Sequence, residues 1–180
     1  MHVLLGFVPF TSGEARIFGR DVRKSIARQR IGYLPERPDT YGFLTGKEFL
    51  EMSGRLFLLS GKTLKKRIDY LLDLVKMSQA GRRRISTYSR GMMQRICLAQ
   101  ALVNDPDLVI LDEPAGGLDP SGRMDIRKIV GSLKDQNKTV FFSSHELSEV
   151  ELVCDHLAIL VNGRVAAAGS AEELIPSDQS

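Results

Sequence analysis

The spacing of hydrophobic positions changes several times along the chain, and the changes divide it into predicted strands and helices. Short apolar runs predict strands, and two of them, lacking polar interruptions, are typical of strands buried on both faces of a parallel sheet. Three of the predicted strands are residues 30–35, 108–111 and 139–142, and the last two are the ones expected to be buried. Apolar residues at helical spacing predict helices over residues 45–79 with a break at Ser60–Gly61, and over residues 89–103, 121–133 and 146–154.

Both ends of the chain carry signals for turns. Residues 14–18 alternate like an edge strand after a turn, and Asn162–Gly163 between two apolar runs predicts a hairpin of residues 157–161 and 164–168. A short helix is expected at residues 171–174. Strands that alternate with helices predict an α/β domain with a mainly parallel sheet, in which ligands bind at the carboxyl ends of the strands. One domain over residues 1–180 is expected, with residues 43–88 as a helical subdomain.

The composition is that of an ordinary globular protein, with 43% hydrophobic and 26% charged residues. The net charge of +3 is spread along the chain and favours no nucleic-acid partner. The basic run Arg82–Arg84 fits either an anionic partner or a solvated helix end, and the second interpretation is favoured. Cys97 and Cys154 lack metal-ligand spacing and are expected to be small core residues. No apolar run is long enough to cross a bilayer, so a cytoplasmic location is expected.

Asp112 and Glu113 directly follow the apolar run at residues 108–111, which places two carboxylates at the carboxyl end of a rigid strand. An aspartate there can hold Mg²⁺, and the next glutamate can polarise the water that attacks a terminal phosphate. By itself, the pair could equally end a strand and cap a turn. The surrounding motifs decide between these interpretations.

Five segments in one order support the catalytic interpretation. In chain order they are IGYLPE (31–36), YSRGMMQR (88–95), LVILDEP (108–114), GLDP (117–120) and SSH (143–145). These segments resemble, respectively, the Q-loop, signature, Walker B strand, D-loop and switch histidine of the ATP-hydrolysing subunits of ABC transporters. The resemblance covers essentially the whole chain, and coincidence is a poor explanation for five motifs in that order.

The second and fifth motifs also have a direct physical interpretation. Ser89 and Gly91 open a helix whose unpaired amides form an anion site. His145 follows a strand, from where an imidazole can contact a γ-phosphate and the attacking water. The resemblance implies that Ser89 and Gly91 meet the γ-phosphate of ATP held by a second cassette, in a homo- or heterodimer, with Asp119 at the seam between the two sites.

The motifs depart from the common family pattern at three positions. Arg90 replaces the first glycine of the signature, and Met92 replaces its glutamine. The Arg90 side chain would either add positive charge to the phosphate site or point to solvent, and solvent is favoured slightly. Glu36 occupies the usual glutamine position of the Q-loop, which keeps an oxygen for the metal or the water but adds negative charge. It is interpreted as a variant that resembles some export-type members.

No segment of residues 1–180 fits the phosphate loop G-x-x-x-x-G-K-[ST], known as Walker A. Gly61–Lys62–Thr63 is rejected because no buried strand precedes it. Leu4–Leu5–Gly6 and residues 9–13 resemble segments that follow Walker A in the family. The resemblance therefore implies a P-loop NTPase-like fold with a helical signature subdomain that is N-terminally incomplete. The strand that leads into Walker A is expected centrally, beside the strand bearing Asp112, so that a slot would lie open.

These observations predict an ATPase subunit that energises a separate membrane permease, most similar to bacterial exporters, on the inner face of the membrane. Catalysis is expected from Glu113 and His145, and Mg²⁺ binding from Asp112 and Glu36. ATP binding is expected from Glu36, Ser89, Gly91, Asp112 and Asp119. One alternative is a non-hydrolytic permease-docking or regulatory remnant. A third hypothesis, an ABC ATPase of DNA repair or translation, would need coiled coils, tandem cassettes or a basic stripe that the sequence lacks.

Overall fold

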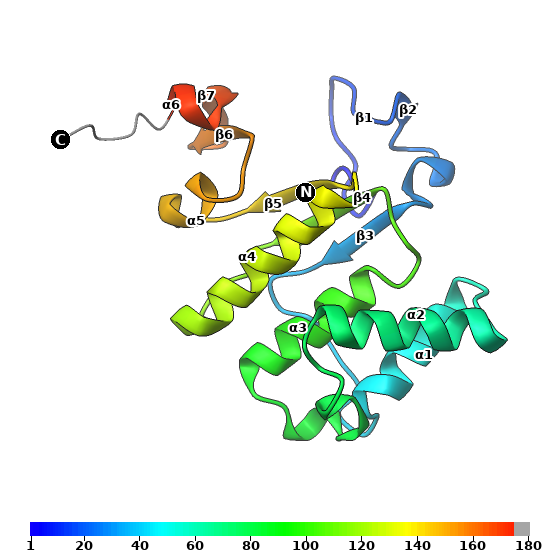
Figure 1. Cartoon of the computed structure of the whole chain (residues 1–180). Coiled ribbons are helices and arrows are strands. Elements are labelled where there is room, and N and C mark those ends of the chain that lie inside the picture. Colours follow the sequence, from blue (N-terminus) through cyan, green and yellow to red (C-terminus); the bar gives the residue numbers. More distant parts are fainter. Residues whose placement is uncertain (175–180) are drawn as a thin grey trace. The chain divides into compact units, whose positions relative to one another are not determined.

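The computed structural model describes residues 1–174, except for the side chains of residues 148 and 149. The chain forms two compact units, residues 1–143 and the residues from 144 onward, and each is described by itself. The first unit contains, in chain order, β1 (Arg16–Ile17), β2 (Arg20–Asp21), β3 (Ile31–Leu34), α1 (Gly46–Leu56), α2 (Gly61–Leu74), α3 (Arg90–Ala101), β4 (Leu108–Asp112), α4 (Pro120–Asp135) and β5 (Thr139–Ser143) (Figure 1). Short 3-10 helices lie at Ser25–Arg28, Ala80–Arg82 and Ile85–Thr87.

A three-stranded parallel sheet forms the centre of the first unit, which confirms the predicted α/β class. The strand order is β3-β4-β5, and β4 is buried over its four apolar residues. In the ladder Leu34 pairs with Leu111, and Asp112 pairs with Ser143. The three carboxyl ends therefore meet at one edge of the sheet, where the sequence predicts the chemistry.

Two expectations about this sheet were wrong. The strand leading into Walker A was expected beside the strand of Asp112, but β4 already has β3 on one side and β5 on the other. A strand has only two hydrogen-bonding edges, so no third neighbour fits there. Residues 139–142 were expected to be buried, yet β5 alternates between exposed and half-buried, and Phe141 is 47% exposed. Among the described residues, β5 pairs only with β4 and is an edge strand.

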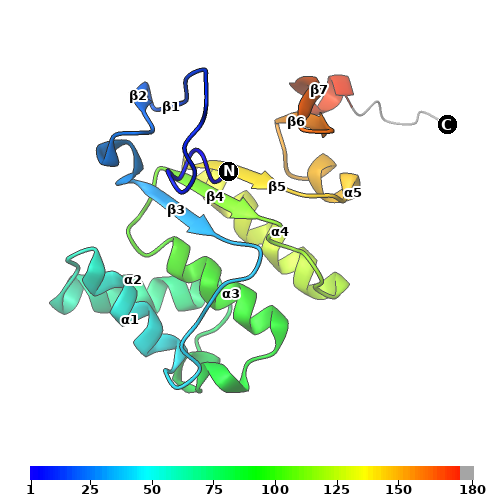
Figure 2. The same ribbon diagram turned by 180° about the vertical axis from the view of Figure 1, so that it is seen from behind.

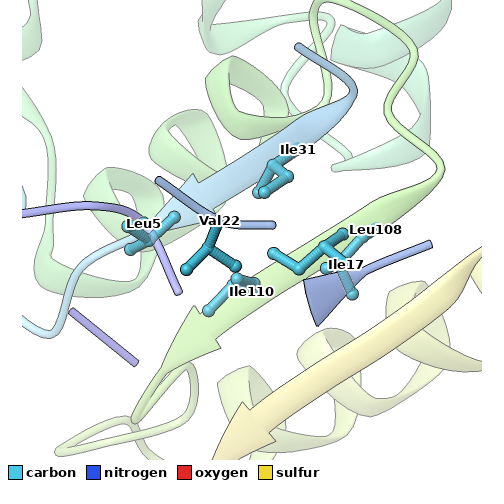
Figure 3. Packing of buried hydrophobic residues seen from close by; sticks show 6 residues of the cluster. All are labelled: Leu5, Ile17, Val22, Ile31, Leu108 and Ile110. Atoms are coloured by element: carbon cyan, nitrogen blue, oxygen red, sulfur yellow. The ribbon is translucent and has the colours of Figure 1, made fainter. Parts of the chain in front are cut away.

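An apolar cluster covers one face of β3 and β4 (Figure 3). Its members come from the N-terminal turn, the β1–β2 region and the two strands: Leu5, Ile17, Val22, Ile31, Leu108 and Ile110. The turn ends at Gly6 (φ +73°), where the Phe7 amide donates to the His2 carbonyl and the Gly6 amide to the Val3 carbonyl. This pair of hydrogen bonds is common at the carboxyl ends of helices, and the positive φ suits glycine.

Helices lie on the opposite face of the sheet, where α4 runs along it in both views (Figures 1 and 2). The end of α3 packs against β3 so closely that a Cβ atom on Gly32 would lie 2.0 Å from the Ala101 carbonyl oxygen. Only glycine permits this approach. The predicted helices over residues 45–79 are α1 and α2, and α1 begins with a capping box in which Thr45 and Glu48 bond to each other's backbone amides.

The second unit contains α5 (Leu147–Glu151), β6 (His156–Val161), β7 (Arg164–Ser170) and α6 (Ala171–Leu174). The predicted hairpin is confirmed: β6 and β7 pair antiparallel around Asn162 and Gly163, which both have positive φ. The helix α5 is shorter than the predicted 146–154. Of the two cysteines, Cys97 is buried, as expected, and burial raises the pKa of its thiol to about 12. Cys154 is only half-buried.

No helix in the described part of the chain is both long and apolar enough to cross a membrane.

Candidate functional site

Asp112, predicted to bind Mg²⁺, and Glu113, predicted to be catalytic, lie at the carboxyl end of β4, beside the end of β5. The Ser143 hydroxyl joins them: it donates to Asp112 Oδ1 at 2.7 Å and accepts from the Glu113 backbone amide at 3.1 Å. Both carboxylate residues are half-buried. Ser143 was predicted only as part of the segment around His145, although the equal lengths of the two predicted strands could have indicated that it lies opposite Asp112.

The chain turns sharply after β4, in a segment that we call the carboxylate loop (residues 113–119). Glu113 has a φ of +49°, a left-handed conformation that costs a non-glycine residue of order 1 kcal/mol or more. Two backbone hydrogen bonds form the turn, from the Gly116 amide to the Glu113 carbonyl (3.0 Å) and from the Leu118 amide to the Ala115 carbonyl (3.2 Å). The strained start of the loop therefore depends on contacts from outside it.

The carboxylate loop ends at Asp119, which is the N-cap of α4. Its carboxylate accepts a hydrogen bond from the Gly122 amide at 3.0 Å, and Pro120 occupies the first helical position. Asp119 is exposed. Its place at a dimer seam stays a prediction.

The signature segment begins α3. Ser89 is the N-cap, and its hydroxyl oxygen accepts a hydrogen bond from the Met92 amide at 3.3 Å. This bond leaves the hydroxyl proton able to donate to another group. Tyr88 fixes the preceding backbone, because its phenol donates to the Ala80 carbonyl at 2.8 Å. Burial raises the pKa of Tyr88. The first turn of a helix has amides without partners inside the helix, and the binding of an anion at this turn stays a prediction.

Arg90 does not simply point to solvent, which was the favoured expectation. The side chain is exposed, but its Nη2 donates to the Gly116 carbonyl at 3.0 Å. The next residue in the signature, Gly91, faces the same loop, since a Cβ atom there would lie 3.9 Å from Leu118 Cδ2. The tip of α3 therefore bears on the carboxylate loop, a contact between segments more than 20 residues apart that the sequence pattern did not indicate.

Glu36 lies two residues beyond β3 and is exposed, with its carboxylate 3.8 Å from the Arg37 guanidinium. A cleft of about 470 Å³ separates this Q-loop from the tip of α3. The cleft is lined by Glu36, Arg37, Pro38, Tyr88, Ser89, Arg90, Met93 and Gln94. Glu36 and Ser89 thus share one hollow in the first unit.

Residues suited to a magnesium–nucleotide complex are present, but no complete metal cage is. In residues 1–174 as described, no three His, Cys, Asp or Glu side chains lie close enough together to hold a metal ion. Mg²⁺ bound with a nucleotide needs only one or two protein carboxylates, because phosphates and waters complete its shell. Asp112 fits such a partial set. On the neighbouring strand β3, burial raises the pKa of Tyr33, and the negative charge of Asp112 raises it further.

His145 belongs to the second unit and is exposed. It stands in a short turn in which the Glu146 amide donates to Ser144 Oγ at 3.1 Å. Its role beside Glu113 stays a prediction. Asp112, Glu113, Ser89, Gly91, Glu36 and Asp119 all lie in the first unit.

A parallel sheet has paired carboxylates at its carboxyl end, and the tip of α3 contacts the loop that follows them. Two solved structures have this fold. One is an ATP-binding subunit of an ABC transporter (TM-score 0.83, 28% identity), of which the chain covers 73%. The other is CbiO1 of Clostridium perfringens, part of the ABC transporter complex CbiONQ (TM-score 0.86, 26% identity), of which it covers 72%. Each covers 96% of this chain.

The chain belongs to the ABC transporter family, whose model matches residues 1–116. Among its curated relatives, an uncharacterized ABC transporter ATP-binding protein of Nostoc sp. is 45% identical over the whole chain. The bacitracin transport ATP-binding protein of Bacillus licheniformis is 39% identical over 92% of it. The chain spans only about half the length of these relatives, 54% in both cases.

Proposed function

We propose that this chain is the part of an ABC transporter ATPase that carries the water-activating carboxylate, and that ATP hydrolysis there drives export through a separate permease. The observation that supports this most is the Ser143 hydroxyl, which joins Asp112 and Glu113 at the edge where three parallel strands end. A surface acidic pair has no need of such a support. A pair that must hold a metal and orient a water molecule needs its two residues fixed relative to each other.

Each residue has a definite task in this proposal. Bound Mg²⁺–ATP supplies the terminal phosphate and the charge neutralisation. Asp112 would hold the metal, Glu36 would offer a second oxygen, and Glu113 would accept a hydrogen bond from the attacking water. His145 steadies the γ-phosphate. Ser89 and Gly91 face the nucleotide of a second cassette, and Asp119 lies at the seam.

A permease is the proposed partner, and the cytoplasmic face of the membrane is the proposed location. Beyond the Q-loop, Tyr41 and Phe43 are 51% and 71% exposed, with ring centroids 5.9 Å apart. Exposed neighbouring aromatic rings are typical of protein interfaces. Export is favoured because relatives include a linearmycin resistance ATP-binding protein of Bacillus subtilis and Nod factor export ATP-binding proteins.

The test is steady-state ATP hydrolysis by the full-length protein that carries residues 1–180, with its permease. Glu113→Gln should lower kcat by about 10²-fold or more, because it removes the general base but keeps the side-chain shape. Glu14→Gln, which changes an exposed carboxylate of the β1 region, is the matched control and should leave kcat unchanged. Full turnover by Glu113→Gln would contradict the proposal.

The polypeptide of residues 1–180 alone is expected to show no ATP turnover, since it contains no Walker A sequence. Glu113-dependent hydrolysis by this polypeptide would refute that expectation. The alternative function, docking on a permease without hydrolysis, predicts that the full-length protein binds the permease but has no Glu113-dependent ATPase.

A further inference from the structure

We propose that Arg90 is a positioning residue that holds the carboxylate loop, and with it Glu113, against the tip of the signature helix. The inference rests on the proposed function, because Glu113 is taken as the general base. It gives a task to the residue that departs most from the glycine-rich signature pattern. It also links, within one chain, the surface proposed to meet the nucleotide of a second cassette with the carboxylate of this chain's own site.

The first support is the geometry of the contact. Arg90 Nη2 donates to the Gly116 carbonyl at 3.0 Å, and Gly116 is itself bonded through its amide to the Glu113 carbonyl at 3.0 Å. One side chain of α3 is thus connected to the backbone of the catalytic glutamate through a single residue. A hydrogen bond from a charged donor is stronger than a neutral one, which suits a contact at an exposed surface.

The second support is the fit between Arg90 and Gly117. A Cβ atom on Gly117 would lie 2.4 Å from the Arg90 guanidinium carbon, and Gly117 has a φ of +66°. The guanidinium therefore lies directly against Gly117, a position whose positive φ favours glycine. The contact thus brings together an arginine of the signature and a glycine of the D-loop, two segments separate in the sequence.

The third support is the strain at Glu113. Its φ of +49° is unfavourable, and such conformations persist only where the surroundings hold them. Ser143 holds the front of the loop through the Glu113 amide, and Arg123 Nε holds its end through the Leu118 carbonyl at 3.0 Å. Arg90 supplies the contact between these two. Without it, the middle of the carboxylate loop would lose its side-chain support from α3.

The experiment uses Arg90→Ala and Arg90→Lys in the full-length protein with its permease. Hydrogen exchange without nucleotide should be faster in a peptide covering residues 113–119 of Arg90→Ala, and unchanged in one covering residues 46–56. In ATPase assays kcat should fall about ten- to hundredfold, with KM for ATP changing less than about twofold, because the loss is of orientation and not of binding. Arg90→Lys keeps a charged donor and should recover part of both effects.

Arg82→Ala removes another exposed arginine, distant in sequence from the loop, and serves as the matched control with wild-type exchange and kcat. If Arg90→Ala keeps wild-type exchange in residues 113–119 and wild-type kcat, the positioning role is overturned. If the wild-type protein lacks Glu113-dependent hydrolysis, the proposed function fails instead. In that case hydrogen exchange alone decides whether Arg90 holds the loop. Unchanged exchange in residues 113–119 of Arg90→Ala would overturn the positioning role, and faster exchange would support it.

Discussion

The strands β4 and β5 have equal length and similar apolar sequences, Leu-Val-Ile-Leu-Asp and Thr-Val-Phe-Phe-Ser, yet differ sharply in burial. β4 has a strand on each side, a cluster over one face and helices over the other. β5 pairs with β4 alone among the described residues. An apolar run therefore shows that a strand suits an interior, but whether it is covered depends on neighbours far away in the sequence. Side-chain hydrogen bonds also connect the two segments at both ends. Ser143 donates to Asp112 where the strands end, and Lys138 donates to Asp105 just before the strands begin.

The largest effect on the free energy of unfolding is expected when Ile110 is replaced. Its partner across the ladder, Phe141, provides the comparison. Ile110 is 0% exposed and Phe141 is 47% exposed. Ile110→Ala should lower the free energy of unfolding by about 3 kcal/mol, through lost burial and a cavity. Phe141→Ala should cost about 1 kcal/mol or less. Urea unfolding measures both, and equal losses would mean that β5 is packed like an interior strand.

Ser143→Ala should have the next largest effect, because it leaves both the Glu113 amide and the Asp112 carboxylate without the bridging hydroxyl. We expect a loss of about 1–2 kcal/mol in urea unfolding. Ser132→Ala is the control: its hydroxyl donates to the Ile129 carbonyl within α4 and joins no two strands, so the change should stay within about 0.5 kcal/mol. A loss no larger than that of Ser132→Ala would show that the hydrogen bonds of the Ser143 hydroxyl contribute nothing to stability.

A smaller, pH-dependent effect is expected where the two strands begin. The Lys138 hydrogen bond, followed by the charges of Arg67, Lys138 and Arg30, lowers the pKa of Asp105 below its ordinary 3.8. The carboxylate stabilises the fold above pH 3.8, and the contribution is lost as the pH falls through the lowered folded pKa. Asp105→Asn tolerates the positive φ and should cost about 0.5–1 kcal/mol at pH 7, since Asp105 is mostly exposed.

Thermal unfolding of the two proteins from pH 7 to pH 2.5 checks this. The gap between wild type and Asp105→Asn should be constant above about pH 5 and close as acid protonates Asp105. A gap that stayed open at the lowest pH would show that the charge is not its source.

The smallest effect on stability, but a visible one on association, is expected for Phe141→Lys. A lysine on an exposed edge discourages pairing with the edge of another molecule. The free energy of unfolding should change by less than about 0.5 kcal/mol. Light scattering of residues 1–180 should show slower aggregation than wild type. Unchanged aggregation would mean that the free edge of β5 is not the contact through which molecules associate.

The elements that local sequence determines were predicted well. The start of α1 near residue 45, the start of α3 at Ser89, the strand β4 and the Asn162–Gly163 hairpin all follow from patterns within a few residues. The exposure of β5 and the neighbours of β4 were not predicted, because strand order depends on how distant segments pack. The helix α5 is also shorter than its pattern indicated.

The residues of the candidate site also fall into two groups, those that local sequence predicts and those that only the fold reveals. Asp112 and Glu113 could be found because they follow an unbroken apolar strand. The Ser143 bridge needed the register between two strands, and the partner of Arg90 lies 26 residues away, in a loop whose shape only the fold reveals. Local sequence thus identified the proposed reacting groups, whereas the residues that contact them required the structure.

The absence of a side chain at Gly32 has a mechanical consequence. The close approach to Ala101 anchors the far end of α3 on the sheet, and the helix then extends over 12 residues, roughly 18 Å, to the carboxylate loop. Helix α3 is therefore packed on β3 at its carboxyl end, while its amino end contacts the carboxylate loop. Arg90 lies at the opposite end of this helix, so one rigid element joins the close packing at Gly32 to the loop that carries Glu113.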